Sequence, residues 1–155
     1  MTDAERISIL TIQMAEDDPD DRFLMEQALL ETGIYSDLRV VEDGEELMDY
    51  LLRSGKYIDA ALSPRPGLIF LDLNMPKKDG RQALLEIKAD HDLRKIPVVI
   101  WTTSEEREDK NQCQKAGADV FVTKPASYTK LVTCLKKLVQ RYSSQNTADN
   151  ESYGS

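Results

Sequence analysis

The apolar residues of the chain fall into two kinds of segment that alternate along it. Short apolar runs, such as residues 67–71 and 97–101, have the length of strands that are covered on both faces. Longer segments place apolar residues three or four positions apart, which is typical of an amphipathic helix. The expected strands are residues 7–15, 38–41, 67–71, 97–101 and 120–122. The expected helices are residues 19–32, 44–53, 80–90, 105–116 and 127–141.

Five strand–helix units in strict alternation predict an α/β fold. Strands that are separated by helices run parallel, and right-handed crossovers place the helices on both faces of the sheet. We therefore expect a doubly wound, five-stranded parallel sheet. Glycines 33 and 117 follow two of the expected helices, where a left-handed residue ends a helix without steric cost.

The length of 155 residues predicts a single domain, which we expect to cover residues 1–142. Residues 143–155 are polar and have almost no apolar anchors, so we expect them to form a disordered tail. This organisation leaves no residues for an output domain.

The formal net charge of −8 changes the range of expected partners. Nucleic acids and anionic membranes repel an acidic surface, so neither is expected as a main partner. No apolar run approaches the length of a membrane span, and residues 1–6 are acidic and lack the apolar stretch of a signal peptide. These features predict a protein of the cytoplasm.

Chemically distinctive residues follow four of the five expected strands. An acidic run at residues 16–21 follows the first strand, and Asp72 follows the third. Thr102 follows the fourth and Lys124 follows the fifth. Ligands of open parallel sheets bind at the carboxyl ends of the strands, so we expect these side chains to meet. Clustered carboxylates need a cation, and Mg²⁺ prefers oxygen ligands. An aspartate can also accept a phosphoryl group, whose charge a metal and a lysine would neutralise.

The acidic run holds more carboxylates than a metal site needs. Asp18 precedes a proline and reads as the N-cap of the following helix. Asp20 and Asp21 fall in the first helical turn, where the helix dipole favours negative charge. This assignment leaves Glu16 and Asp17 for the metal site.

Taken together, these residues resemble the receiver domains of two-component response regulators. The matching positions are Glu16 and Asp17 after the first strand, Asp72 after the third, Thr102 after the fourth, and Lys124 with Pro125 after the fifth. The match runs from about residue 7 to residue 141. Each of these motifs alone is weak evidence for the family, whereas four motifs at strand ends in this order are specific evidence.

The resemblance implies a five-stranded (βα)5 fold with flavodoxin-like strand order. It implies that Asp17, Asp72 and the backbone carbonyl of Asn74 hold Mg²⁺, and that Glu16 acts through a water molecule. It implies that Asp72 receives a phosphoryl group from a sensor histidine kinase or a histidine phosphotransfer protein, with Lys124 and Thr102 as the other catalytic residues.

The resemblance also implies how the signal would leave the domain. Thr102 would turn toward the phosphorylated Asp72, and Phe121 would rotate into the space left behind. A regulator without an output domain then acts by altered protein binding, either on an effector directly or as an intermediate that passes the phosphoryl group on. The lifetime of the phosphoryl group would depend on Asn74 and Ser104, each two positions past a site residue.

Within the family, the chain looks most like the single-domain regulators that are paired with bacterial phytochromes. The similar segments are the long connection at residues 54–66, residues 77–81 and residues 102–104. This narrower resemblance implies a homodimer that forms through the fourth helix, the fifth strand and the fifth helix. Trp101 and Ala126 depart from the usual aliphatic residue and phenylalanine of the family.

Three other functions fit the same fold. A hydrolase of the aspartyl-phosphate type would need a second aspartate where the chain has Asn74. A flavin-binding module would need a phosphate loop after the first strand, where Glu16 and Asp17 repel phosphate. A receiver-like protein that binds partners without phosphorylation would not need the complete acid–aspartate–threonine–lysine set. We therefore expect a phosphoacceptor switch, not an enzyme that turns over an external substrate.

Overall fold

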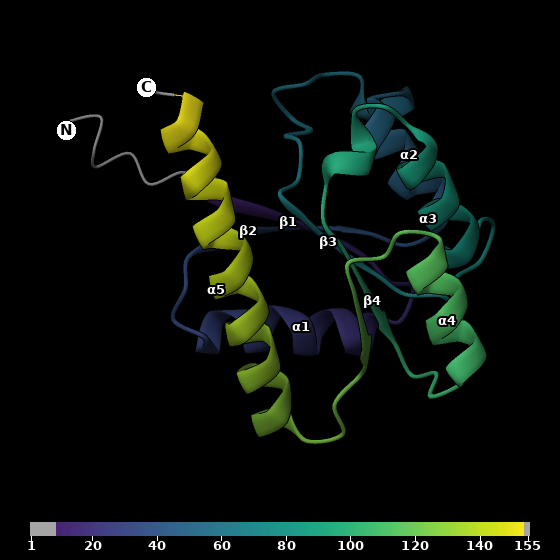
Figure 1. Ribbon diagram of the computed structural model, residues 1–155, viewed down its shortest axis with the longest axis vertical. Coiled ribbons are helices and arrows are strands. Elements are labelled where there is room, and N and C mark those ends of the chain that lie inside the picture. Colours follow the sequence, from purple (N-terminus) through teal and green to yellow (C-terminus); the bar gives the residue numbers. More distant parts are fainter. Residues whose placement is uncertain (1–8, 154–155) are drawn as a thin grey trace.

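The computed structural model describes the backbone of residues 9–153 and the side chains of residues 9–143. Five parallel strands form one sheet in the order β2-β1-β3-β4-β5 (Figure 1). The strands are β1 (Leu10–Ala15), β2 (Ser36–Val41), β3 (Leu68–Leu71), β4 (Val98–Thr102) and β5 (Val120–Thr123). This order is the flavodoxin-like one, so the predicted fold is confirmed.

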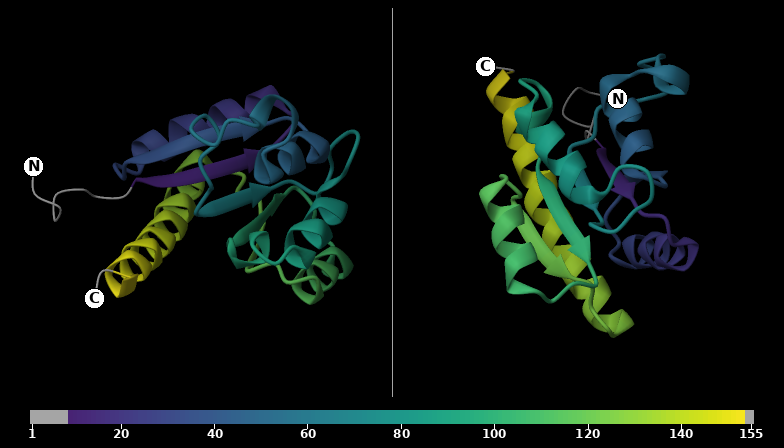
Figure 2. Two further views of the ribbon diagram at one scale, coloured as in Figure 1. Left: turned by 90° about the horizontal axis from the view of Figure 1, so that it is seen from above. Right: turned by 90° about the vertical axis from the view of Figure 1, so that its right-hand side faces the viewer.

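Within the described residues, four α-helices connect the strands and a fifth follows β5, and together they flank the sheet (Figure 2). They are α1 (Pro19–Glu31), α2 (Gly44–Leu52), α3 (Gly80–Ala89), α4 (Arg107–Lys115) and α5 (Tyr128–Tyr153). Two short 3-10 turns, η2 (Gly55–Tyr57) and η3 (Leu93–Lys95), lie in the connections that lead to β3 and β4.

The sheet separates two hydrophobic cores. Alternate residues of β3 point to opposite faces, and all four are fully buried, as the continuous apolar run predicted. Leu68 and Phe70 pack in the core beneath α1 and α5, whereas Ile69 and Leu71 pack in the core beneath α2 and α3. Burial on both faces fixes β3 at the centre of the sheet, so Asp72 at its end has a rigid base.

Aspartate side chains cap the helices that begin near the carboxyl edge of the sheet. Asp18 accepts a hydrogen bond from the backbone N–H of Asp20, at 2.9 Å, and Pro19 is the first residue of α1. Asp79 caps α3 in the same way. The predicted N-cap at Asp18 is therefore confirmed, and the capped helix start directs the acidic run toward the ends of the strands.

Two ends of the fold differ from the sequence prediction. β1 begins at Leu10, and residues 7 and 8 of the expected strand lie outside the described residues. Helix α5 passes the boundary that we expected at residue 142, and its backbone is helical through Tyr153, where we expected a disordered tail from residue 143. Because no glycine or proline occurs between Tyr128 and Tyr153, no residue in that segment interrupts the helix.

No helix of the described region combines the length and the apolar character that a membrane span needs.

Candidate functional site

The carboxyl ends of β1 and β3 bring three acidic side chains together. Carboxylate oxygens of Glu16, Asp17 and Asp72 all lie within 4.8 Å of one another. Glu16 is 1% exposed and Asp72 is 7% exposed, whereas Asp17 faces solvent. Two buried carboxylates and one exposed carboxylate offer hard oxygen ligands at a point that a hydrated cation can reach. The predicted meeting of these strand ends is confirmed.

Lys124 joins this acidic cluster from the end of β5. Its ammonium group donates hydrogen bonds to Glu16 at 2.5 Å, to Asp21 at 2.8 Å and to Asp72 at 3.2 Å. The side chain of Lys124 is 13% exposed, so these charge-assisted bonds are shielded from solvent. Three carboxylates thus accept bonds from one ammonium group, and Asp17 adds a fourth negative charge to the cluster, which keeps an excess of negative charge.

Burial and neighbouring charges both change the pKa of Glu16. Burial raises the pKa of Glu16 to about 7; the hydrogen bond from Lys124 opposes the rise, and the neighbouring Asp72 adds to it. Burial also opposes the charge of Lys124, but its hydrogen bonds to Asp21 and Glu16 outweigh burial, so the pKa of Lys124 lies above its ordinary value. A divalent cation at the cluster would favour the ionised form of Glu16.

Asp21 is a member of the site that the sequence did not reveal. Its position in the sequence predicts a place in the first helical turn, where the helix dipole accounts for its charge. In the structure that turn packs next to the end of β5, and the Asp21 carboxylate accepts a hydrogen bond from Lys124. The acidic run itself is the only sequence signal, and it does not distinguish Asp21 from the exposed Asp20.

The loop after Asp72 is held by contacts that only glycine permits. The Gly80 N–H donates to the Leu73 carbonyl at 2.9 Å, and a Cβ at Gly80 would overlap the backbone of Asp72. The Gly44 N–H donates to the Lys78 carbonyl at 2.9 Å, again with no room for a side chain. The loop is therefore clamped between β3 and the N-termini of α2 and α3.

Asn74 lies within this loop. It is exposed, and its backbone N–H donates to the Asp72 carboxylate at 3.3 Å. This bond orients the carboxylate, and the backbone carbonyl of Asn74 as a metal ligand stays a prediction.

Thr102 and Phe121 lie on the two strands at the other side of the site. Thr102 is fully buried, and its hydroxyl oxygen accepts a hydrogen bond from the Ser104 N–H at 3.2 Å. Its backbone carbonyl accepts a 2.7 Å bond from the N–H of Lys124. Phe121 is half-buried and packs against the core beneath α2 and α3. Their roles in a switch stay predictions.

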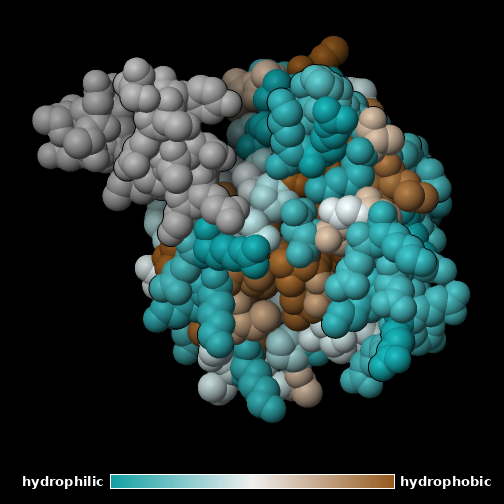
Figure 3. Space-filling view, viewed as in Figure 1, coloured by the Kyte–Doolittle hydropathy of each residue, from teal (hydrophilic) through white to brown (hydrophobic). Residues whose placement is uncertain are grey.

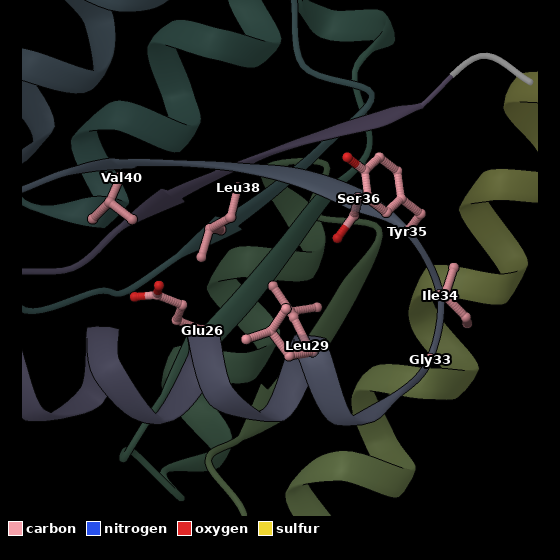
Figure 4. A pocket seen from close by; sticks show the side chains of 9 residues that line it. Glu26, Leu29, Gly33, Ile34, Tyr35, Ser36, Leu38 and Val40 are labelled. Atoms are coloured by element: carbon pink, nitrogen blue, oxygen red, sulfur yellow. The ribbon is translucent and has the colours of Figure 1, made fainter.

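A concave surface between α1 and β2 is lined mainly by apolar residues and lies apart from the acidic cluster. A pocket of about 510 Å³ lies between α1 and β2, where Leu29, Ile34 and Leu38 line it (Figure 4). It shares none of its lining residues with the acidic cluster, and Glu26 is its single charged side chain. The groups that can support phosphoryl chemistry therefore lie at the strand ends and not in this pocket.

Comparison with known proteins identifies the family. The model of the response regulator receiver domain matches residues 12–136. The chain belongs to this family. Response regulator Rcp1 of Synechocystis sp. is 41% identical over 113 residues, which are 73% of this chain and 75% of that protein.

Solved structures agree with the family. The phosphorylated cyanobacterial phytochrome response regulator RcpA has a TM-score of 0.80 and 36% identity, over 87% of this chain and 94% of that one. The Mn²⁺-bound form of Rcp1 has a TM-score of 0.75 and 36% identity, over 84% of this chain and 91% of that one. The chain is thus a receiver domain, a phosphoacceptor switch of two-component signalling, and the resemblance to phytochrome regulators is confirmed.

Proposed function

We propose that this protein accepts a phosphoryl group on Asp72 from a phosphohistidine, with Mg²⁺ bound. One observation carries the proposal: Asp72, at the end of the central strand β3, belongs to the acidic cluster and also lies within reach of Lys124. Its carboxylate is near those of Glu16 and Asp17 and accepts a hydrogen bond from Lys124. The donor is a sensor histidine kinase or a histidine phosphotransfer protein, and the similarity to RcpA favours a kinase of the phytochrome class.

The donor set fits Mg²⁺. Asp17, Asp72 and the Asn74 carbonyl would hold the ion, and Glu16 would act through a water molecule. The clustering of three carboxylates supports this assignment, because hard oxygen ligands suit Mg²⁺. The pKa of Glu16, raised first by burial and further by Asp72, supports it too, because a bound cation would stabilise the ionised carboxylate. When bound, the metal supplies charge neutralisation at the phosphoryl oxygens.

The side chains of the protein supply the rest of the chemistry. One carboxylate oxygen of Asp72 attacks phosphorus and forms the new O–P bond. The P–N bond of the phosphohistidine breaks, and its electron pair returns to the histidine nitrogen. Lys124, already 3.2 Å from Asp72, is positioned to pair with a transferred phosphoryl oxygen. Water later cleaves the acyl phosphate, so the protein acts as a self-resetting switch and not as an enzyme for an external substrate.

The signal then leaves through protein binding in the cytoplasm. Thr102 turns toward the phosphorylated Asp72 and Phe121 follows, which changes the surface around β5. We propose a homodimer through α4, β5 and α5 as one output surface. Figure 3 supports it with hydrophobic side chains in the hollow between α4 and α5, where the residues of β5 are half-buried. The downstream effector would bind the same region.

Mass spectrometry after incubation with acetyl phosphate and Mg²⁺ tests the central claim. Wild-type protein should gain one phosphoryl group, and Asp72→Asn should gain none because the nucleophile is lost. The control is Asp20→Asn, which removes a nearby exposed carboxylate outside the cluster and should be modified like wild type. Unmodified wild-type protein, or a phosphoryl group on a residue other than Asp72, would refute the proposal.

A further inference from the structure

Three side chains outside the acidic cluster form a hydrogen-bonded chain next to Thr102. The Ser104 hydroxyl donates to one carboxylate oxygen of Asp109 at 2.7 Å. The guanidinium group of Arg81 donates to the other carboxylate oxygen at 2.9 Å and, through Nε, at 3.3 Å. We call these three residues the loop latch. They come from the loop after β4, from α4 and from α3, so the latch joins three separate segments.

Asp109 is the centre of this latch. Most of the side chains of α4 face solvent, but Asp109 is only 9% exposed. Both of its oxygens accept bonds from other elements, and hydrogen bonds from Ser104 and Arg81 hold the pKa of Asp109 below its usual value. A buried carboxylate with partners on two other segments resists separation from either of them.

Ser104 connects the latch to the switch threonine. Its backbone N–H donates to the Thr102 hydroxyl oxygen at 3.2 Å, and its carbonyl accepts a bond from the Thr123 hydroxyl at 3.0 Å. The Thr102 hydroxyl thus accepts its hydrogen bond from its own loop, and the Thr102 carbonyl accepts one from the N–H of Lys124. The latch therefore holds the loop in an arrangement that keeps Thr102 bonded to its own loop.

At its other end the latch reaches the loop that carries Asp72. Arg81 follows Gly80, whose N–H is bonded to the Leu73 carbonyl. Arg81 thus ties Asp109 to the clamped loop after Asp72. Ser104 lies in the loop after β4, which has to move when Thr102 turns toward Asp72. Any shift of Thr102 toward Asp72 that displaces Ser104 must stretch the bond between Ser104 and Asp109.

We propose that the loop latch positions Thr102 in the unphosphorylated protein, so that its strength sets how readily Asp72 is phosphorylated. This inference rests on the proposed function. Arg81, Asp109 and Ser104 act through Thr102 and are positioning residues. A weaker latch lowers the cost of moving Thr102 to the phosphoryl group, and phosphorylation becomes faster.

The test measures the initial rate of phosphorylation by acetyl phosphate and Mg²⁺ in the full chain. Asp109→Asn and Ser104→Ala should each raise the rate roughly fivefold, the effect of losing one net hydrogen bond of about 1 kcal/mol. The conservative Arg81→Lys keeps a cation at Asp109 and should stay close to wild type, whereas Arg81→Gln should be fast. Glu108→Gln is the matched control, because Glu108 is an exposed acid of α4 whose partner is Gln112 of the same helix.

A double-mutant cycle separates the latch from a merely structural role. If the bond between Ser104 and Asp109 acts as one unit, the double variant Ser104→Ala/Asp109→Asn should be no faster than the faster single variant. Thermal unfolding of each variant reports the loss of stability alone. A structural role would lower the melting temperature and leave the rate unchanged.

The outcomes distinguish this inference from the proposed function. If wild-type protein is not phosphorylated on Asp72, the proposed function fails and the latch fails with it. If wild type is phosphorylated but folded Asp109→Asn and Ser104→Ala have the wild-type rate or a slower one, the latch alone is overturned. Should Asp109→Asn fail to fold, the comparison of Arg81→Lys with Arg81→Gln decides the same question.

Discussion

Single residues at the site have properties that depend on their neighbours more than on their type. Glu16 would be an ordinary acid in water, but burial places its pKa near neutrality. Lys124 would be a mobile surface cation, but three carboxylates hold its ammonium group at the centre of the site. The residue types were readable from the sequence, and Asp72, Glu16 and Lys124 lie together as predicted. Their ionisation depends on distances that only the folded chain defines.

The affinity for Mg²⁺ should depend on pH around neutrality. A proton on Glu16 competes with the cation, and the pKa of about 7 places this competition in the accessible range. Affinity should rise between pH 6 and pH 8, by up to about tenfold per pH unit below the pKa for one displaced proton. Calorimetric titration with Mg²⁺ measures this dependence. In Glu16→Gln it should be nearly flat, and an equally steep curve in that variant would contradict the assignment.

The raised pKa of Glu16 also determines how the stability of the metal-free protein changes with pH. The pKa of Glu16 in the fold, about 7, lies above the ordinary value of 4.5. Between pH 4.5 and 7 the folded metal-free protein therefore holds a proton on Glu16 that the unfolded chain has lost. The contribution of this proton to the free energy of unfolding is fully present below pH 4.5 and is lost as the pH rises through 7. Added Mg²⁺ should raise the melting temperature more at pH 8 than at pH 6.

At the scale of elements, the sequence predicted the type and order of the strands and helices well and their ends less well. The apolar run at β3 and the capping residue Asp18 are strong local signals, and both predictions are confirmed. Helix α5 continues to Tyr153 because no residue there interrupts it, although its polar sequence suggested otherwise. Element ends depend on small differences in local free energy, so they are the weakest part of a sequence-based prediction.

The close packing of α3 against the end of β3 leads to a prediction about Gly80. In Gly80→Ala the new methyl group would overlap the Asp72 backbone, which cannot rotate away as a side chain could. We expect a loss of about 1–3 kcal/mol in the free energy of unfolding and slower phosphorylation, because the loop must shift. Chemical denaturation and the acetyl phosphate assay measure the two effects.

Gly33→Ala is the control for this substitution. Gly33 has a positive φ of 73° but open space around it, so an alanine there is strained without touching the site. It should lower stability by about 1 kcal/mol and leave the phosphorylation rate unchanged. A wild-type rate in folded Gly80→Ala would show that the loop tolerates the shift.

At the scale of the whole molecule, two edge strands and two helical layers define the surfaces that remain for partners. β5 forms one edge of the sheet, between α4 and α5, and β2 forms the other, beside the pocket under α1. The proposed homodimer uses the β5 edge. Both edge strands carry apolar residues. Introducing a charge on each edge in turn can therefore show which of them forms the interface of the proposed homodimer.

One valine substitution on each edge strand provides that comparison. Val122→Asp places a charge on β5 and should convert the proposed dimer to a monomer. Because Val122 is half-buried against the core beneath α1 and α5, thermal unfolding has to show that the variant stays folded. Val40→Asp places the same charge on β2, where Val40 is 39% exposed, and should leave the dimer intact. Sedimentation velocity measures the oligomeric state of both variants. A monomer caused by Val40→Asp alone would place the interface at the β2 edge instead.

The sequence by itself determined the fold class, the family and the acidic residues, aspartate, threonine and lysine of the site, because alternating apolar runs and residues at strand ends are local features. The tertiary structure alone decided which further side chains join them. Asp21 reaches Lys124, and Arg81 reaches Asp109, across large separations in sequence. Such contacts depend on how helices pack on the sheet, and no local pattern of residues specifies which polar groups that packing brings within hydrogen-bonding distance.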